Sequence, residues 1–176
     1  MTLDTREWMI LVYKIPSHPT RLRAHIWRRL VRCGALYLQN SVCLLPATPE
    51  AGENLRWLAD EIEEMGGEAH GFRAHTAGPR GDAALLSRFR DVAAREREKV
   101  AAGLQALKRR LRGRLDLTAL EEAEAEFRRL RLALLRCDQR DHFPGRDRAA
   151  PERLLRQVRG ALETQYARVA GWGRRR

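Results

Sequence analysis

Five arginines and one histidine lie within a short segment near the N-terminus. Between Thr20 and Cys33 there is no Asp or Glu, and the basic residues are Arg21, Arg23, His25, Arg28, Arg29 and Arg32. A guanidinium group binds phosphate and other tetrahedral oxyanions through a planar fork of donors. At about 100° per residue, four of the six share one side of a helix: Arg21, His25, Arg28 and Arg32. The six residues form a candidate nucleic-acid or oxyanion site.

Two interpretations of this segment are open from the residues alone. Backbone N–H groups at the start of the helix, near Thr20 to Arg23, would add to the attraction for an anion. The same pattern also fits a helix face that is simply exposed to water. The sequence gives both interpretations equal support.

The charge of the 176-residue chain is unevenly distributed. Residues 1–78 hold equal numbers of basic and acidic side chains, so the whole formal net charge of +11 lies in residues 79–176. Such a balance favours nucleic acid or an anionic surface as the partner. The stretch Lys108–Arg114 is a second candidate, although cations at a helix end are also stabilised by the helix dipole without any ligand. The stretches Arg128–Arg131 and Arg174–Arg176 could extend one long basic surface.

Patterns for catalysis or metal binding are absent from the sequence. The five histidines are scattered, Cys33, Cys43 and Cys137 form no CxxC pair, and no Gly-rich phosphate loop follows a strand. We therefore expect a protein that is not an enzyme, with no metal and no cofactor. The odd number of cysteines favours a reducing, cytoplasmic compartment. The apolar run Trp8–Tyr13 is too short to span a membrane.

The first half of the chain predicts an α+β, ferredoxin-like βαββαβ unit over residues 1–78. The apolar run 8–15 predicts a strand, and Thr20 predicts the cap of a helix that buries Leu22, Ile26, Leu30 and Trp27 and ends before Gly34. Segments 35–38 and 41–45 flank Gln39-Asn40, which fits a tight hairpin turn or a bulge in one longer strand, because Asn tolerates the left-handed region. We favour a hairpin of two antiparallel strands. Thr48-Pro49 begins a second helix, Gly66-Gly67 ends it, and residues 68–76 predict the last strand.

The second half predicts a helical extension over residues 79–176. Residues 78–81 read as a linker, after which Asp82 caps a long helix that ends near residues 113–116. The next helix has a coiled-coil seam that pairs it with the first as an antiparallel hairpin; the seam consists of Leu120, Ala123, Phe127, Leu130, Leu134 and Cys137. Residues 140–143 predict a structured turn with Phe143 in the core, and Pro151 opens a final helix.

Two stretches of the first half resemble a known family. They are WMILVYKIPSHPTRLRAHIWRRLVRCGALYLQNSVCLLP and RWLADEIEEMGGEAHGFRA. They are similar to the N-terminal domain of the bacterial chromate-resistance regulator ChrB, and the similarity continues through residues 88–91 and 140–143. The strand, the Arg-rich helix and the LQNSV hairpin are also similar to PaaX-type repressors and to the small CRISPR spacer-acquisition proteins of ferredoxin-like fold.

The resemblance implies a DNA-binding transcriptional regulator, or a regulatory module, linked to chromate resistance. It also implies a homodimer, which would cover the sheet edges. One alternative is a protein that binds chromate or sulfate through the same arginines without binding DNA. Another is a metal-dependent nuclease like the CRISPR proteins, but Lys14 stands where they place a metal-binding Asp. Full-length members of the family have a further C-terminal domain, so chromate sensing that depends on it is not implied.

Overall fold

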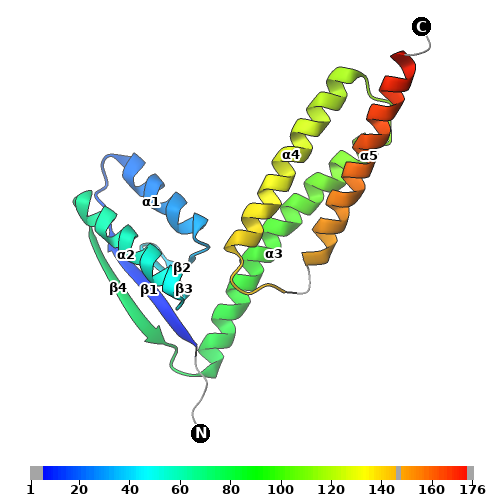
Figure 1. The fold of residues 1–176 in the computed structure, drawn as a ribbon. Helices are drawn as coiled ribbons and strands as arrows, with labels where there is room; N and C mark the ends of the chain where they lie inside the picture. Colours follow the sequence, from blue (N-terminus) through cyan, green and yellow to red (C-terminus); the bar gives the residue numbers. More distant parts are fainter. Residues whose placement is uncertain (1–5, 146–147, 174–176) are drawn as a thin grey trace. The chain divides into compact units, whose positions relative to one another are not determined.

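The chain folds into two compact units in the computed structural model, which describes residues 6–145 and 148–173. The first unit comprises residues 1–90 together with 140–143, and the second comprises residues 91–139 and 144–176. The element order is βαββαβ followed by three long helices (Figure 1). This order confirms the predicted α+β class and the ferredoxin-like arrangement.

The first unit contains a four-stranded antiparallel sheet. Its strands are β1 (Glu7–Lys14), β2 (Leu36–Gln39), β3 (Val42–Pro46) and β4 (Glu68–His75), in the order β2-β3-β1-β4. The apolar strand β1 is central, and its Leu11 lies opposite Cys43 on one side and Gly71 on the other. The predicted hairpin is confirmed, but Ser41 rather than Asn40 takes the positive φ, at 67°.

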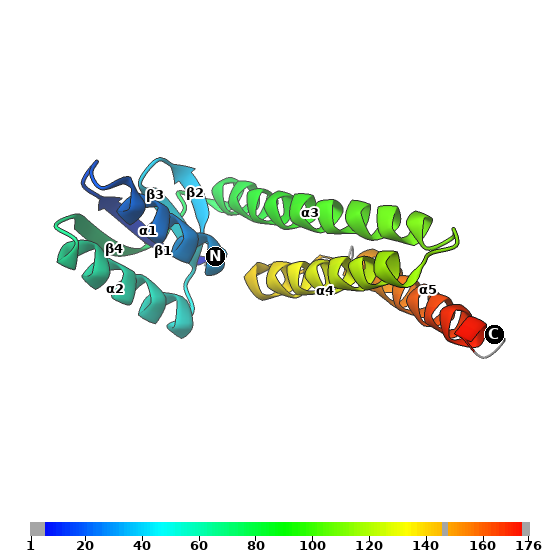
Figure 2. The ribbon, with the colours of Figure 1, turned by 90° about the horizontal axis from the view of Figure 1, so that it is seen from above.

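Two helices cover one face of this sheet, α1 (Thr20–Arg32) and α2 (Pro49–Glu64) (Figures 1 and 2). They bury a single core with the inward side chains of the strands, and its fully buried members include Leu11, Ile26, Leu30, Cys43 and Ile62. Helix α2 begins as predicted, because the hydroxyl of Thr48 accepts a hydrogen bond from the N–H of Ala51 at 3.1 Å. Both helices therefore owe their position to the sheet.

The opposite face of the sheet is covered in part by the start of α3 (Pro79–Arg110). Trp8 stacks on Phe89 with ring centroids 5.7 Å apart, and Phe143 meets both rings edge-on. Phe143 thus joins the core of the first unit, as predicted. The turn 140–143 that carries it also contacts the end of α1, since Nε2 of His142 donates a hydrogen bond to the carbonyl of Cys33 at 2.9 Å.

The second unit contains the rest of α3, together with α4 (Leu117–Arg140) and α5 (Ala149–Gly173) (Figures 1 and 2). The predicted hairpin is confirmed, because α3 and α4 share one core, which α5 joins through Val158 and Leu162. The predicted break is also present, and Asp116 begins α4 by accepting a hydrogen bond from the N–H of Ala119 at 2.8 Å.

Four local predictions were wrong. Pro19, not Thr20, is the N-cap of α1, and no side chain caps that helix. Trp27 is 54% exposed rather than part of the buried stripe. Residues 79–81 form the first turn of α3 rather than a linker, because Pro79 sets the backbone angle that a first turn needs. Asp82 consequently lies inside the helix, where it is buried.

Candidate nucleic-acid interface

The basic helix α1 is held rigidly on the sheet. On the side of α1 that faces the sheet, Ile26 and Leu30 are fully buried, and burial of each side chain contributes about 1.5–3 kcal/mol to stability. At its C-terminal end Gly34 has φ +73°, as expected for the position after a helix. A Cβ on Gly34 would lie 2.4 Å from the carbonyl oxygen of Arg140, so the turn 140–143 packs closely there. The arginines therefore project from a fixed support.

Three of the predicted residues form an outward row on α1. Arg21, Arg28 and Arg32 are exposed and lie opposite the buried Leu30. Nε of Arg28 donates to the carbonyl of Ala24 at 3.1 Å, which keeps its guanidinium along the helix. Within the described part of the chain, none of the three arginines has a carboxylate partner. We call these three residues the arginine row.

Two other predicted residues are drawn toward α2 by Glu61. Nη1 of Arg29 lies 2.6 Å from Oε2 of Glu61, and Nε2 of His25 donates to Oε1 of the same carboxylate at 2.7 Å. Glu61 is only 22% exposed, whereas Arg29 and His25 are each more than 40% exposed. One carboxylate therefore offsets part of the charge on this flank of α1, which reduces the anion-binding capacity of both partners.

The sixth predicted residue, Arg23, lies away from the arginine row. Its Nη2 donates to the carbonyl of Ser17 at 3.3 Å, in the loop that leads into α1. This end of α1 has no acidic residue in its first turn and no side-chain cap. The N–H of Leu22 donates a hydrogen bond to the backbone carbonyl of Pro19 at 3.1 Å. The positive end of the helix dipole is therefore not compensated by a side chain.

Two exposed tryptophans lie on the same two helices as the basic residues. The sequence analysis did not predict that either would be exposed. Trp27 of α1 is 54% exposed and Trp57 of α2 is 63% exposed. Trp57 lies one helical turn before Glu61, on the flank of α2 that faces α1. A helical wheel signals Trp57, because it falls well outside the arc of about 60° that holds the buried Leu55, Leu58 and Ile62. Exposed aromatic rings beside cations are typical of surfaces that bind nucleic acid.

Next to the arginine row lies a thiol of low reactivity. Burial raises the pKa of Cys33, and the nearby Arg29 and Arg32 lower it only in part. Burial also raises the pKa of Cys43, to about 12. Because the thiolate is the reactive form, neither cysteine is set up as a nucleophile.

The second predicted basic stretch, Lys108–Arg114, is divided between internal contacts and an open cleft. Nζ of Lys108 donates to Oε1 of Gln157 at 2.8 Å, and Arg110 lies 3.5 Å from Glu122 and 3.3 Å from Glu126. Arg112 and Arg114 line a cleft of about 970 Å³. Arg174–Arg176, another predicted stretch, lie outside the described residues.

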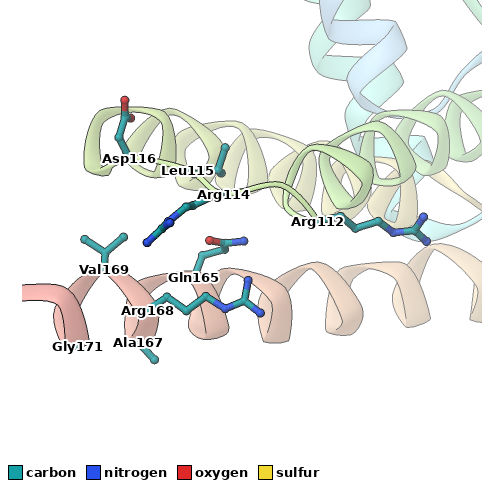
Figure 3. A pocket seen from close by; sticks show the side chains of 9 residues that line it. All are labelled: Arg112, Arg114, Leu115, Asp116, Gln165, Ala167, Arg168, Val169 and Gly171. Carbon is teal, nitrogen blue, oxygen red and sulfur yellow. The ribbon is translucent and has the colours of Figure 1, made fainter.

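Figure 3 shows this cleft between the α3–α4 connection and α5. In this view Arg168 lies along α5, below Arg114 and to the left of Arg112, and the three side chains do not converge on one point. Nε2 of the buried Gln165 donates to the carbonyls of Leu111 and Gly113, both at 2.7 Å. Gln165 therefore holds the connection in place, and the cleft adds a dispersed basic surface to the second unit.

Residues 6–145 and 148–173 contain neither a metal-binding cluster nor a membrane-spanning helix. No three His, Cys, Asp or Glu side chains gather there in a way that could hold a metal ion. None of the helices described is both long and apolar enough to cross a membrane. Lys14 lies at the end of β1.

The protein is of the α+β class. It has a ferredoxin-like unit with a basic first helix, and a three-helix unit follows in the chain. Residues 23–172 match the family model described as Protein ChrB, N-terminal. The match covers nearly the whole chain, so the chain belongs to the ChrB N-terminal family, as the sequence resemblance predicted. Membership is consistent with a regulatory module related to chromate resistance. A search of curated proteins found none that matches the chain.

Proposed function

We propose that this chain is a DNA-binding module of a transcriptional regulator of chromate resistance, and that the arginine row contacts the phosphate backbone. The observation that carries the proposal is the row itself: three outward arginines on a rigid helix, without a carboxylate partner in the described residues. Family membership supplies the regulatory context. The proposed module is not an enzyme.

The spacing of the row favours a polyanion over a single oxyanion. Arg21 and Arg32 are separated along the helix axis by about 16 Å, at a rise of 1.5 Å per residue, with Arg28 between them. DNA presents regularly repeated phosphates, so one strand can engage separate guanidinium groups. A single chromate or sulfate ion needs donors that converge on one point. The two basic residues that do converge, His25 and Arg29, already share Glu61.

Salt-dependent DNA binding tests the proposal. The triple variant Arg21→Ala, Arg28→Ala and Arg32→Ala should bind duplex DNA more weakly and reduce the slope of log affinity against log salt by up to about 2.7, since each phosphate contact contributes about 0.9. Fluorescence anisotropy at several salt concentrations measures both. The helix should stay folded, because the three side chains are exposed and Ala favours helix.

A matched control removes three exposed arginines elsewhere: Arg153→Ala, Arg156→Ala and Arg159→Ala on α5. This control lowers the net charge by the same amount, so it separates a contact from a general charge effect. Equal losses in the two triple variants would reject the arginine row as the DNA site. Calorimetry with chromate and with sulfate tests the oxyanion alternative, and plasmid cleavage with added Mg²⁺ tests the nuclease alternative.

A further inference from the structure

The exposed face of α4 carries opposite charges in its two halves. Glu121 and Glu122 lie in the first half and Arg128 and Arg129 in the second, with the exposed Ala125 midway between them. All five side chains point away from the helix face that packs into the core of the second unit. Oε2 of Glu122 lies 3.5 Å from Nη2 of Arg110, but the side chain is still 69% exposed, so its carboxylate remains accessible. The helix therefore presents an acidic patch in its first half and a basic patch in its second half.

Large apolar side chains lie on the same face. Leu132 and Leu135 are 52% and 53% exposed, and Leu117 at the start of the helix is 53% exposed. At about 100° per residue, these three leucines fall within the arc that also contains Ala125 and Arg128. Neither α3 nor α5 covers them, although both pack on other sides of α4 in the same core. The face combines charged patches with leucines at its two ends, as expected for a helix interface.

We propose that this face of α4 pairs antiparallel with the same face of a second copy of the chain. A two-fold axis at Ala125 brings together residues at similar distances before and after it. The axis keeps each flank of the helix on the same side, so Glu121 meets Arg128 of the second copy on one flank and Glu122 meets its Arg129 on the other. Each pair occurs twice by symmetry, and the small Ala125 lets the two helices approach closely. Leu132 meets the first turn of the other α4, near Leu117 and Thr118.

Charge complementarity selects a second copy as the occupant of this face. A parallel arrangement would place acid against acid and base against base, whereas the antiparallel arrangement makes every facing pair opposite in sign. The net charge of +11 per chain opposes association at long range. At physiological ionic strength the Debye length is about 8 Å, so that repulsion is largely screened while the close pairs are screened less. This inference does not depend on the proposed DNA binding.

Charge reversal tests the pairing. Sedimentation velocity of the full chain at physiological salt should show a dimer for the wild type. The variant Glu121→Arg, Glu122→Arg should be monomeric because basic side chains then face basic side chains at all four contacts, and the variant Arg128→Glu, Arg129→Glu should be monomeric because carboxylates then face carboxylates there. An equimolar mixture of these two variants should form a heterodimer, which no general loss of stability would produce.

Two controls accompany the experiment. Reversal of two exposed charges on α5, Arg153→Glu and Arg156→Glu, should leave the wild-type dimer intact. The variant Leu132→Asp, which keeps all four paired charges, should weaken the dimer, and circular dichroism checks that every variant is helical. A monomeric wild type at all concentrations, charge-reversed variants that still form the wild-type dimer, or a mixture that yields no heterodimer would each overturn the proposal.

Discussion

The indole N–H of Trp8 donates a hydrogen bond to Oδ1 of Asp82 at 2.8 Å, which joins the first strand to the first turn of α3. Oδ2 of the same carboxylate accepts from the backbone N–H of Arg6 at 2.9 Å. Trp8 is 1% exposed and Asp82 is 7% exposed. A buried carboxylate that accepts from two donors fixes α3 to the sheet, and the bond from Trp8 is itself buried, away from water.

Replacing Asp82 with Ala should destabilise the first unit by about 1–3 kcal/mol, the cost of leaving a buried donor without a partner. Urea unfolding followed by tryptophan fluorescence measures this loss. Asp60→Ala on the exposed side of α2 is the control and should change little. Equal stability of the two variants would show that the Trp8–Asp82 bond contributes nothing.

The same carboxylate predicts a pH dependence. The hydrogen bond from Trp8 lowers the pKa of Asp82 below its ordinary value of 3.8, against the opposing effect of burial, and the Arg6 N–H lowers it further. The unfolded chain binds the proton more tightly, so Asp82 stabilises the fold fully above about pH 4 and loses this contribution as the pH falls through its lower native pKa. The variant Asp82→Asn should therefore lose less stability than the wild type in this acid range, measured by unfolding at a series of pH values.

Removing the carboxylate of Glu61 should strengthen DNA binding. The variant Glu61→Gln frees Arg29 and His25 from their shared partner, and we expect an affinity about two- to fivefold higher, in line with the energy of a partly exposed ion pair. Glu63→Gln makes the same charge change on the flank of α2 away from α1, and it should have a smaller effect. If the two variants gain equally, the gain reflects net charge alone.

Two glycines with similar backbone angles separate strain from packing. Gly34 has φ +73° and Gly66 has φ +76°, but only at Gly34 would a Cβ meet another atom, the carbonyl of Arg140 at 2.4 Å. Gly66→Ala should cost about 1–2 kcal/mol of stability from backbone strain. Gly34→Ala should cost clearly more, because the turn 140–143 must also move. Similar losses in urea unfolding would mean that this turn does not pack against α1.

Gln165 should be important for the stability of the second unit. It is 2% exposed and donates to two carbonyls of the α3–α4 connection. The variant Gln165→Leu leaves both carbonyls without this partner and should cost about 1–3 kcal/mol. Gln157→Leu, at an exposed position whose side chain accepts a hydrogen bond from Lys108, is the control in thermal unfolding. A control that is equally destabilised would argue against this role.

Much of the fold could be predicted because the signals are local. The Thr48-Pro49 start of α2, the glycine after α1 and the break before α4 each depend on backbone preferences of a few neighbouring residues. The seam of α4 follows from helical periodicity, and its buried members are those that the spacing predicts. The errors at residues 79–81 arose because Gly and Pro favour both loops and first helical turns.

The amino-acid sequence by itself determined the order of the elements and the basic character of α1, since composition and periodicity are properties of short segments. Only the tertiary structure decided which arginines remain available, because Glu61 lies more than thirty residues from its two partners along the chain. The same holds for Asp82 and Trp8, which are 74 residues apart. Periodicity shows which face of a helix is buried. It does not show which other helix packs beside the edge of that face, and ion pairs such as Arg29–Glu61 form at this edge.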